Sequence, residues 1–484
     1  MQGRHEYQAE LFAAVDAESL IPRGHLLRRI NRILDLSFLP ALTAPLYTQG
    51  RGRPSIDPEI FIRMVLLSYL YNIDSDRQLC EEVGYNLAYR WFCKLSLKDA
   101  VPDHSSITRI RDRLGEATYE KIFSEVVDQC RKAGLVKLDQ VMVDGSTIKA
   151  NASIYHMKER DVSSGEAPVA RESESAPPAQ IHSKDGLSNN DFRQRGILGK
   201  TLSNKTHFNP ADPDATLSGK ASESKSLSYK THQTIDADSR VIVDCHVTTG
   251  SVNEVSVFQE RVTAVEEKLA MKIGEVVADR GYGSGANLEF LDARGTKSNI
   301  PLWSSRSGMT FFKQLEHGFK VSDDGKIVHC PAEHKMKYSF YEESTGRHIF
   351  TLPRPTCVAC SKAPQCLTEH EQKTRGKRFS LIDHFEIISR VDGQSREPIF
   401  KQKLWQRMWK MEGIFAEAKS HHGMRRARYR GRAKMQIQVY MISTVQNLKR
   451  LAACDFGWLR SILREFASVF RRTEKSAEIF VFVH

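Results

Sequence analysis

The chain has 484 residues and a formal net charge of +12, with 40% apolar and 27% charged residues. This composition provides a sizeable core and is typical of a soluble protein of roughly three domains. The longest strongly apolar stretch, residues 64–71, is too short to span a membrane, and the N-terminus has no signal-peptide core. We therefore expect a cytoplasmic protein whose nine cysteines are reduced thiols or metal ligands.

Residues 1–125 carry helical patterns. Asp57-Pro58-Glu59 is a good helix start, and the apolar run over residues 61–71 then predicts a mostly buried helix. Asp103 precedes a further helix whose basic residues are Arg109, Arg111 and Arg113. Successive short helices with a basic final member suit a helix-turn-helix-like DNA-binding module. The alternative is a helical dimerisation domain whose arginines face water.

Two short apolar runs each end in an aspartate. Asp144 follows residues 141–143, and Asp279 follows residues 276–278. Such a run predicts a buried strand that delivers a carboxylate at the edge of a sheet. A lone aspartate at a strand end is more often a turn residue, so each motif is weak by itself.

The segment between the two aspartates has three parts. Residues 161–224 are too polar to bury much apolar surface, and we expect a flexible insertion there. Residues 231–235 and 241–247 flank a short turn and predict a β-hairpin. Phe258, Val262, Val265 and Leu269 then fall on one face of a helix.

The segment after Asp279 contains a second insertion, residues 301–394, with four of the cysteines. Cys357-x2-Cys360 is followed by Cys366, and Cys330 lies upstream. Four thiolates can bind a structural zinc ion, although the spacings are not those of a standard zinc finger. Buried cysteines without a metal are the alternative.

The most basic part of the chain surrounds a helical glutamate, Glu412. Residues 401–450 hold 13 lysines and arginines against two acidic residues, Glu412 and Glu417. This window indicates contact with a polyanion, or else a solvated face. Its candidate DNA contacts are Arg407, Lys419, Arg425, Arg426, Arg428, Arg430, Arg432 and Trp405, the last either stacking on an unpaired base or belonging to the core.

Asp144, Asp279 and Glu412 have the chemistry of a metal-ion site. Carboxylates are suitable ligands for Mg²⁺, and a pair of such ions activates the attacking oxygen and stabilises the leaving oxygen in phosphodiester cleavage. Glu417 competes with Glu412, but it lies roughly 140° further around the helix, so both cannot face the same ions.

These segments together resemble the DDE transposases of bacterial insertion sequences. Val143-Asp144-Gly145-Ser146-Thr147 resembles the first-aspartate segment of that family, and Ala278-Asp279-Arg280-Gly281-Tyr282 resembles the second. Glu412 and Lys419 match the spacing of the third. The resemblance also includes Asp212-Pro-Asp-Ala, Tyr229-Lys-Thr-His-Gln and Arg53-Pro-Ser-Ile-Asp-Pro, and so covers most of the chain. Arg407 is displaced by one position from the arginine of the family motif, whose tyrosine is missing.

The resemblance implies an α/β fold with a mixed sheet. An all-α domain over residues 1–125 would precede an RNase H-like catalytic core, with long insertions at 161–224 and 301–394. The core would comprise residues 126–160, 225–300 and 395–455, before a tail over 456–484. Asp144, Asp279 and Glu412 would hold two Mg²⁺ or Mn²⁺ ions, with Asp144 shared by both.

The implied function is cut-and-paste DNA recombination. Such a protein binds the terminal inverted repeats of its element, cleaves the element ends and joins the 3′ hydroxyls to target DNA. We expect double-stranded DNA as partner, a homodimer in the DNA complex, no membrane partner, and a bacterial, nucleoid-associated location. A transposase-derived regulatory protein and a stand-alone metal-dependent nuclease are the alternatives.

Overall fold

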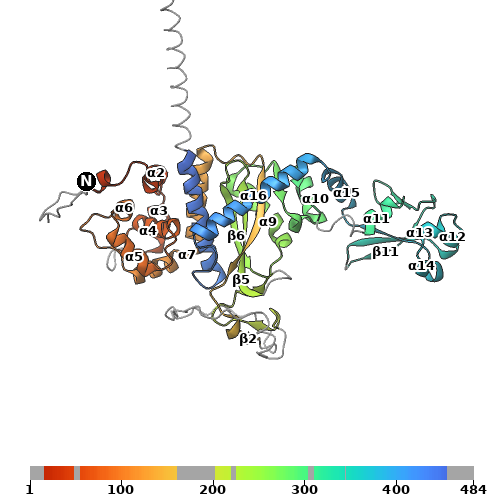
Figure 1. Ribbon diagram of the computed structural model, residues 1–484, viewed down its shortest axis with the longest axis horizontal. Helices are drawn as coiled ribbons and strands as arrows, with labels where there is room; N and C mark the ends of the chain where they lie inside the picture. The colour runs from red at the N-terminus through yellow and green to blue at the C-terminus, as the bar shows by residue number, and fades with distance from the viewer. Residues whose placement is uncertain are drawn as a thin grey trace, which may run out of the picture. The chain divides into compact units, whose positions relative to one another are not determined.

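A computed structural model describes residues 16–47, 55–160, 202–219, 225–302, 310–343 and 345–454 (Figure 1). The chain divides into two compact units. We call residues 1–135, 147–229 and 416–484 the helical unit, and residues 136–146 and 230–415 the sheet unit. Among the described residues, no helix is both long and apolar enough to cross a membrane.

The N-terminal part of the helical unit confirms the predicted helices. Asp57 caps one by accepting a hydrogen bond from the Glu59 N–H at 2.7 Å, and Asp103 caps another through the Ser105 N–H at 2.8 Å. The elements are α1 (Ala17–Leu20), α2 (Leu26–Ile33), α3 (Leu39–Thr43), η1 (Ala44–Leu46), α4 (Pro58–Leu70), α5 (Asp76–Tyr85), α6 (Leu87–Phe92) and α7 (His104–Lys132). Helix α4 is buried from Phe61 to Leu70, as its apolar run predicts.

The rest of the helical unit corrects one expectation. Residues 202–219 lie within the predicted flexible insertion, yet they form β3 (His207–Phe208) and β4 (Thr216–Ser218). Strand β3 pairs with β2 (Lys158–Glu159), which follows η2 (Ile154–His156), and β4 pairs with the start of β5 (Ser226–Asp236). Polar contacts order this segment: buried Asp212 accepts hydrogen bonds from the Tyr229 hydroxyl and from the Gly431 N–H. The other predicted insertion residues, 161–201 and 220–224, and the predicted tail lie outside the described residues.

The core of the sheet unit has the strand order β6-β5-β1-β7-β8. Its remaining strands are β1 (Val141–Lys149), β6 (Ile242–Thr249), β7 (Glu275–Ala278) and β8 (Lys297–Asn299). The predicted hairpin is β5 and β6. Strand β7 runs parallel to both β1 and β8. This mixed sheet confirms the expected α/β fold, and its strand–hairpin–helix–strand sequence is the order expected for an RNase H-like core.

Three helices of the sheet unit belong to this core, and a fourth passes from it into the helical unit. They are α9 (Glu254–Leu269), α10 (Gly285–Ala293), α15 (Phe385–Gln394) and α16 (Pro398–His421), and η3 (Arg280–Tyr282) follows β7. Helix α9 buries Phe258, Val262 and Val265, the face predicted from their spacing. The first residue of α9, Glu254, follows shortly after the end of β6 at Thr249.

The predicted cysteine-containing insertion forms a small α+β module, which we call the cysteine module (residues 310–382). Strands β11 (Lys337–Glu342), β12 (Arg347–Thr351) and β13 (Arg378–Ile382) make an antiparallel sheet. Phe311, Phe319 and Phe379 pack together at its centre. The other elements are α11 (Thr310–Glu316), β9 (Lys320–Val321), β10 (Val328–His329), α12 (Arg354–Val358), α13 (Ala363–Cys366) and α14 (Glu369–Thr374).

Candidate active site

The two predicted aspartates lie level with each other on adjacent parallel strands. The register pairs Val143 of β1 with Ala278 of β7, and Asp144 and Asp279 are the next residues along each strand. Asp144 accepts a hydrogen bond from the Gly145 N–H at 2.8 Å, and Asp279 accepts one from the Gly281 N–H at 2.7 Å. Because neighbouring strands lie roughly 4.8 Å apart, the two carboxylates are close enough to share a ligand.

A third carboxylate, which the sequence analysis missed, reaches the same place. Glu254 is the first residue of α9. A Cβ atom added at Gly145 would lie 2.9 Å from Glu254 Oε1, and one added at Gly281 would lie 3.2 Å from Glu254 Oε2. The Glu254 carboxylate therefore lies close to Gly145 of β1 and to Gly281 of η3, and it leaves little room for side chains at the two glycines.

Two cations accompany the three carboxylates. Arg407 of α16 is buried, with Nη2 2.7 Å from Asp144 Oδ1 and 4.0 Å from Asp279 Oδ2. Its Nε donates a hydrogen bond to the Val143 carbonyl oxygen at 3.2 Å. Lys230 Nζ lies 3.2 Å from Glu254 Oε1. We call Asp144, Asp279, Glu254, Arg407 and Lys230 the acidic cluster.

Ionisation of the carboxylates in the acidic cluster is unfavourable. Burial raises the pKa of Asp144 to about 6, and the charges of Asp279 and Glu254 act in the same direction. Arg407 and the Gly145 N–H lower this pKa but do not compensate fully. Burial likewise raises the pKa of Tyr282, and the same three carboxylates contribute. A further cation beside these groups would relieve the repulsion.

The predicted third ligand, Glu412, does not contact the acidic cluster. It lies exposed on α16, five residues beyond Arg407, and makes no hydrogen bond or ion pair with another described residue. Within the described parts of the chain, no three His, Cys, Asp or Glu side chains already converge on one metal position. The assignment of Glu412 therefore stays a prediction.

Its competitor Glu417 has a different environment, within the helical unit. Glu417 forms ion pairs with Lys449, with Arg450 at 3.1 Å and with His422 at 3.6 Å. Burial opposes ionisation of Glu417, but hydrogen bonds from His422 and Lys449 and the charge of Arg450 hold its pKa well below the usual range. A carboxylate held by three basic side chains has a structural role.

Two of the predicted DNA contacts require correction because their side chains are buried. Arg111 forms a bidentate ion pair with Asp76, at 3.0 and 2.7 Å, and its guanidinium lies 4.7 Å from the centre of the Tyr429 ring. Arg428 lies over the Tyr69 ring and 3.1 Å from Asp74, with a side chain 7% exposed. Extraction of Arg111 would leave the half-buried Asp76 carboxylate without its partner, and extraction of Arg428 would uncover the buried Tyr69 ring. Both arginines therefore stabilise the helical unit.

The other predicted contacts are accessible. Trp405 is 61% exposed, so the prediction that it belongs to the core is wrong. Its ring centre lies 6.4 Å from that of Trp409, which is also exposed. The remaining predicted basic contacts are exposed or half-exposed: Arg109, Arg113, Lys419, Arg425, Arg426, Arg430 and Arg432.

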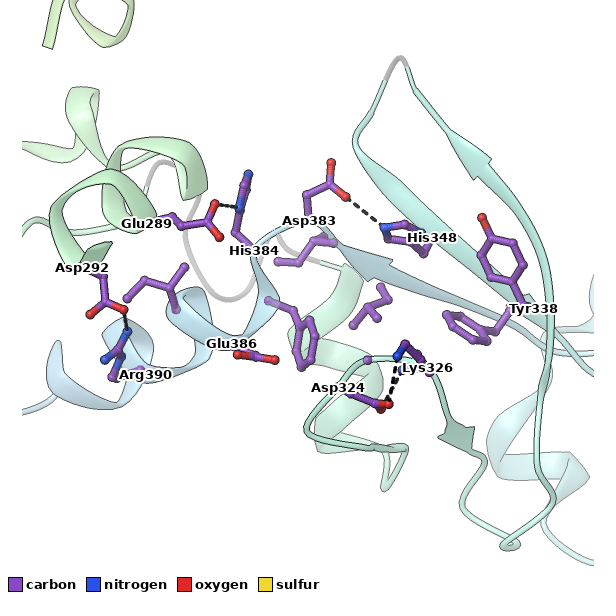
Figure 2. Close-up of a pocket in the computed structure, with 16 residues that line it drawn as sticks. Glu289, Asp292, Asp324, Lys326, Tyr338, His348, Asp383, His384, Glu386 and Arg390 are labelled. Carbon is purple, nitrogen blue, oxygen red and sulfur yellow. Dashed lines mark hydrogen bonds and ion pairs between the residues drawn. The ribbon is translucent and has the colours of Figure 1, made fainter. Parts of the chain in front are cut away.

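A cavity of about 690 Å³ elsewhere in the sheet unit contains none of the predicted site residues (Figure 2). It lies between α10, α15 and the cysteine module. His384 pairs with Glu289 at 2.6 Å, and Arg390 pairs with Asp292 at 2.7 Å. His348 of the module pairs at 3.2 Å with Asp383, the residue that follows β13. The first two pairs join α10 to α15 and to the residue that precedes it.

Two family models match this chain. One is described as a transposase domain (DUF772) and matches residues 15–113, and the other is a transposase DDE domain that matches residues 329–452. The first match covers the N-terminal helices up to the start of α7. The second contains Arg407, Glu412 and the four cysteines of the module.

Three solved structures show weaker likeness. A piggyBac transposase synaptic complex with hairpin DNA has 9% identity and a TM-score of 0.34, covering 88% of this chain and 73% of that one. A Mos1 transposase paired-end complex with the left transposon end has 10% identity and a TM-score of 0.16, covering 54% and 65%. A Mos1 mariner paired-end complex with Mn has 12% identity and a TM-score of 0.16, covering 58% and 71%. Scores this low carry no argument.

Proposed function

Because the chain is a DNA transposase with a DDE domain, we propose that it cuts and rejoins DNA strands with divalent cations held at Asp144 and Asp279. The observation that supports this proposal is the charge of the acidic cluster. Asp144 within β1, Asp279 just after β7 and Glu254 lie near one another, with Arg407 and Lys230 as their only two basic partners among the described residues. Oxygen ligands of this kind suit Mg²⁺ or Mn²⁺.

The aspartates and Glu254 have separate tasks in this proposal. Asp144 and Asp279 project from rigid strands, and the N–H groups of Gly145 and Gly281 fix their orientation. Glu254 lies close to both Gly145 and Gly281 and adds negative charge, so it acts as a ligand or as a positioning residue. Divalent cations bound there would lower the pKa of an attacking water or hydroxyl and stabilise the leaving oxygen.

Arg407 is placed to hold the phosphate that is cut. Its guanidinium is buried beside both aspartates. A phosphate bound by Arg407 would therefore lie next to the acidic cluster, whereas a phosphate bound by a surface arginine could lie anywhere on the protein. A guanidinium can donate two parallel hydrogen bonds to phosphate oxygens, which fixes the orientation of the group. We therefore assign Arg407 to the reacting phosphate and not to general DNA affinity.

Glu412 is the alternative third ligand, supported by the resemblance of its helix to the third family segment. It projects from the same helix as Arg407, and its exposure leaves it free to meet a cation together with bound DNA. Glu254 lies nearer to the two aspartates in the structure, whereas Glu412 has the sequence spacing of the third family segment. Separate Glu254→Gln and Glu412→Gln variants distinguish the two, because only loss of the true ligand weakens cation binding.

DNA would contact exposed basic residues of the helical unit. Arg425, Arg426 and Arg430 follow α16, and Arg109 and Arg113 project from α7. Such residues bind phosphates without reading base sequence. Exposed Trp405 and Trp409 offer ring surfaces on which an unpaired base can stack. The proposed partners are the inverted repeats of the element and a target duplex, bound by a homodimer.

The test is incubation of the full chain with Mg²⁺ and DNA that bears the ends of its own element, followed by mapping of both strands. Cleavage at the element ends and joined 3′ ends in target DNA are expected. Cleavage without joining would favour the stand-alone nuclease. Binding without cleavage, in the wild type and in Asp279→Asn alike, would favour the regulatory protein.

A further inference from the structure

The four cysteines of the module surround one small cavity. Cys330 follows β10, Cys357 belongs to α12, and Cys360 and Cys366 lie before and at the end of α13. All four line a cavity of about 20 Å³, which is comparable to the space that one water molecule occupies. Residues from three separate parts of the module thus bring four thiols to a space that fits a single ion.

The backbone around these thiols has hydrogen bonds suited to thiolates. The Lys377 N–H donates to Cys357 Sγ at 3.3 Å, and the Lys362 N–H donates to Cys360 Sγ at 3.4 Å. Cys330 begins a tight reversal in which its N–H donates to the His334 carbonyl oxygen, and Glu333 takes a left-handed φ of 63°. Such outer hydrogen bonds orient sulfur ligands and stabilise their negative charge.

Two lysines add positive charge beside the cavity. Lys362 and Lys377 both line it. Lys377 Nζ donates to the Cys366 carbonyl oxygen at 2.7 Å, and Lys362 Nζ donates to the Pro331 carbonyl oxygen at 2.5 Å. The lysines would therefore offset part of the negative charge of several thiolates.

The segment from residue 353 to residue 377 has a small apolar core. Its helices α12, α13 and α14 contain five, four and six residues, too few for stability without a packed face. Between residues 353 and 377, the buried apolar side chains are those of Cys357 and Leu367. Small modules with so small a core need a cross-link such as a metal ion or disulfides.

We propose that Cys330, Cys357, Cys360 and Cys366 bind one structural Zn²⁺ ion. All nine cysteines, including these four, are free in the structure. Among the described residues no three potential ligands already converge, so the thiols rotate about their Cα–Cβ bonds to meet the ion. Zinc favours four such sulfurs in a tetrahedral site and deprotonates them as it binds. This role is structural and separate from the DNA chemistry.

The first test is the zinc content of full-length protein purified in reducing buffer without chelator. About one zinc per chain is expected, and Cys357→Ser should abolish it. Cys80→Ser is the matched control, because Cys80 is also a free cysteine but lies in α5 of the helical unit. Zinc-free wild-type protein, or loss of zinc in Cys80→Ser, would overturn the proposal.

A second test needs no variant and so does not depend on whether Cys357→Ser folds. Co²⁺ exchanged into the wild-type protein should give the absorption of a tetrahedral site with four thiolates. Chelation should expose four additional reactive thiols and new protease cleavage between residues 353 and 377. Unchanged thiol reactivity and protease resistance after chelation would contradict zinc binding. Two disulfides among the four cysteines in the purified protein would contradict it equally.

Discussion

Two acidic sites of this protein have opposite charge balances. In the helical unit, Glu417 is one carboxylate among three basic side chains, and its pKa is held low. In the sheet unit, Asp144 is one of three carboxylates that share two cations, and its pKa is raised to about 6. The first site is complete by itself. The second retains negative charge that a bound cation can neutralise.

This difference teaches how to assign acidic residues that look alike in the sequence. Glu412 and Glu417 lie on one helix, five residues apart, and compete as the helical metal ligand, although Glu412 alone has the family spacing to Lys419. Their surroundings distinguish them, because Glu417 is paired with basic side chains whereas Glu412 is exposed. Charge balance, more than position along a helix, therefore distinguishes a structural carboxylate from a candidate ligand.

The largest expected effect follows neutralisation of the acidic cluster. Asp144→Asn should reduce strand cleavage by at least roughly a thousandfold, because a ligand of the catalytic cations is lost. The folded pKa of Asp144 lies above its ordinary value of 3.8, so ionised Asp144 opposes folding at pH 7. The variant should therefore unfold at a temperature equal to or above that of the wild type, as measured by calorimetry. A large loss of stability would show that Asp144 is a structural residue like Glu417.

The Glu417 site should behave in the opposite way. Glu417→Gln should lower the free energy of unfolding by about 2–3 kcal/mol at pH 7, because three basic side chains lose a half-buried partner. The folded pKa of Glu417 lies below its ordinary value of 4.5, so this stabilisation is present above that pH and is lost as the pH falls below it. Glu412→Gln is the matched control on the same helix and should change stability by less than about 0.5 kcal/mol. Denaturant unfolding at pH 7 and at pH 3.5 measures both.

Exposed and buried arginines provide a second contrast. Replacement of Arg425, Arg426 and Arg430 by alanine should weaken binding to all DNA sequences and reduce the salt dependence by about three units of slope. Arg428→Ala should instead lower stability, because Arg428 packs on Tyr69 and pairs with Asp74. DNA binding measured over a range of salt concentrations separates these outcomes. An unchanged slope in the triple variant would leave its arginines as a solvated face.

The smallest expected effect concerns the ion pair between Arg390 and Asp292. Both side chains are about half exposed, so Asp292→Asn should cost less than about 1 kcal/mol of stability. DNA cleavage should be unchanged, because the pair lies in the cavity beside the cysteine module and not in the acidic cluster (Figure 2). Loss of cleavage would extend the functional site into that cavity.

Local patterns were sufficient to predict the end of β7 and several helices, whereas β1 continues through Asp144 to Lys149. Asp144 and Asp279 each follow a short apolar run, and these two runs form adjacent buried strands, as their sequences predict. The face of α9 and the cap at Asp57 were equally local features. These elements depend on residues that are close in sequence, which explains why their prediction succeeded.

Long-range partners explain what the sequence did not reveal. Glu254 looks like an ordinary acid in the first turn of a helix until the fold brings Gly145 and Gly281 next to it. Arg111 looks like a surface residue until Tyr429 and Asp76 enclose it. Residues 202–219 look too polar to fold, yet Asp212 finds Tyr229 and Gly431 further along the chain.

The most direct test of the central claim is calorimetric titration of the full chain with Mn²⁺ in the absence of DNA. We predict that wild-type protein and Glu417→Asp bind Mn²⁺ alike, and that Asp144→Asn and Asp279→Asn lose this binding. Glu254→Gln should weaken it by roughly 10- to 100-fold. Unchanged Mn²⁺ affinity and stoichiometry in a protein that carries both Asp144→Asn and Asp279→Asn would contradict the claim that the acidic cluster is the cation site.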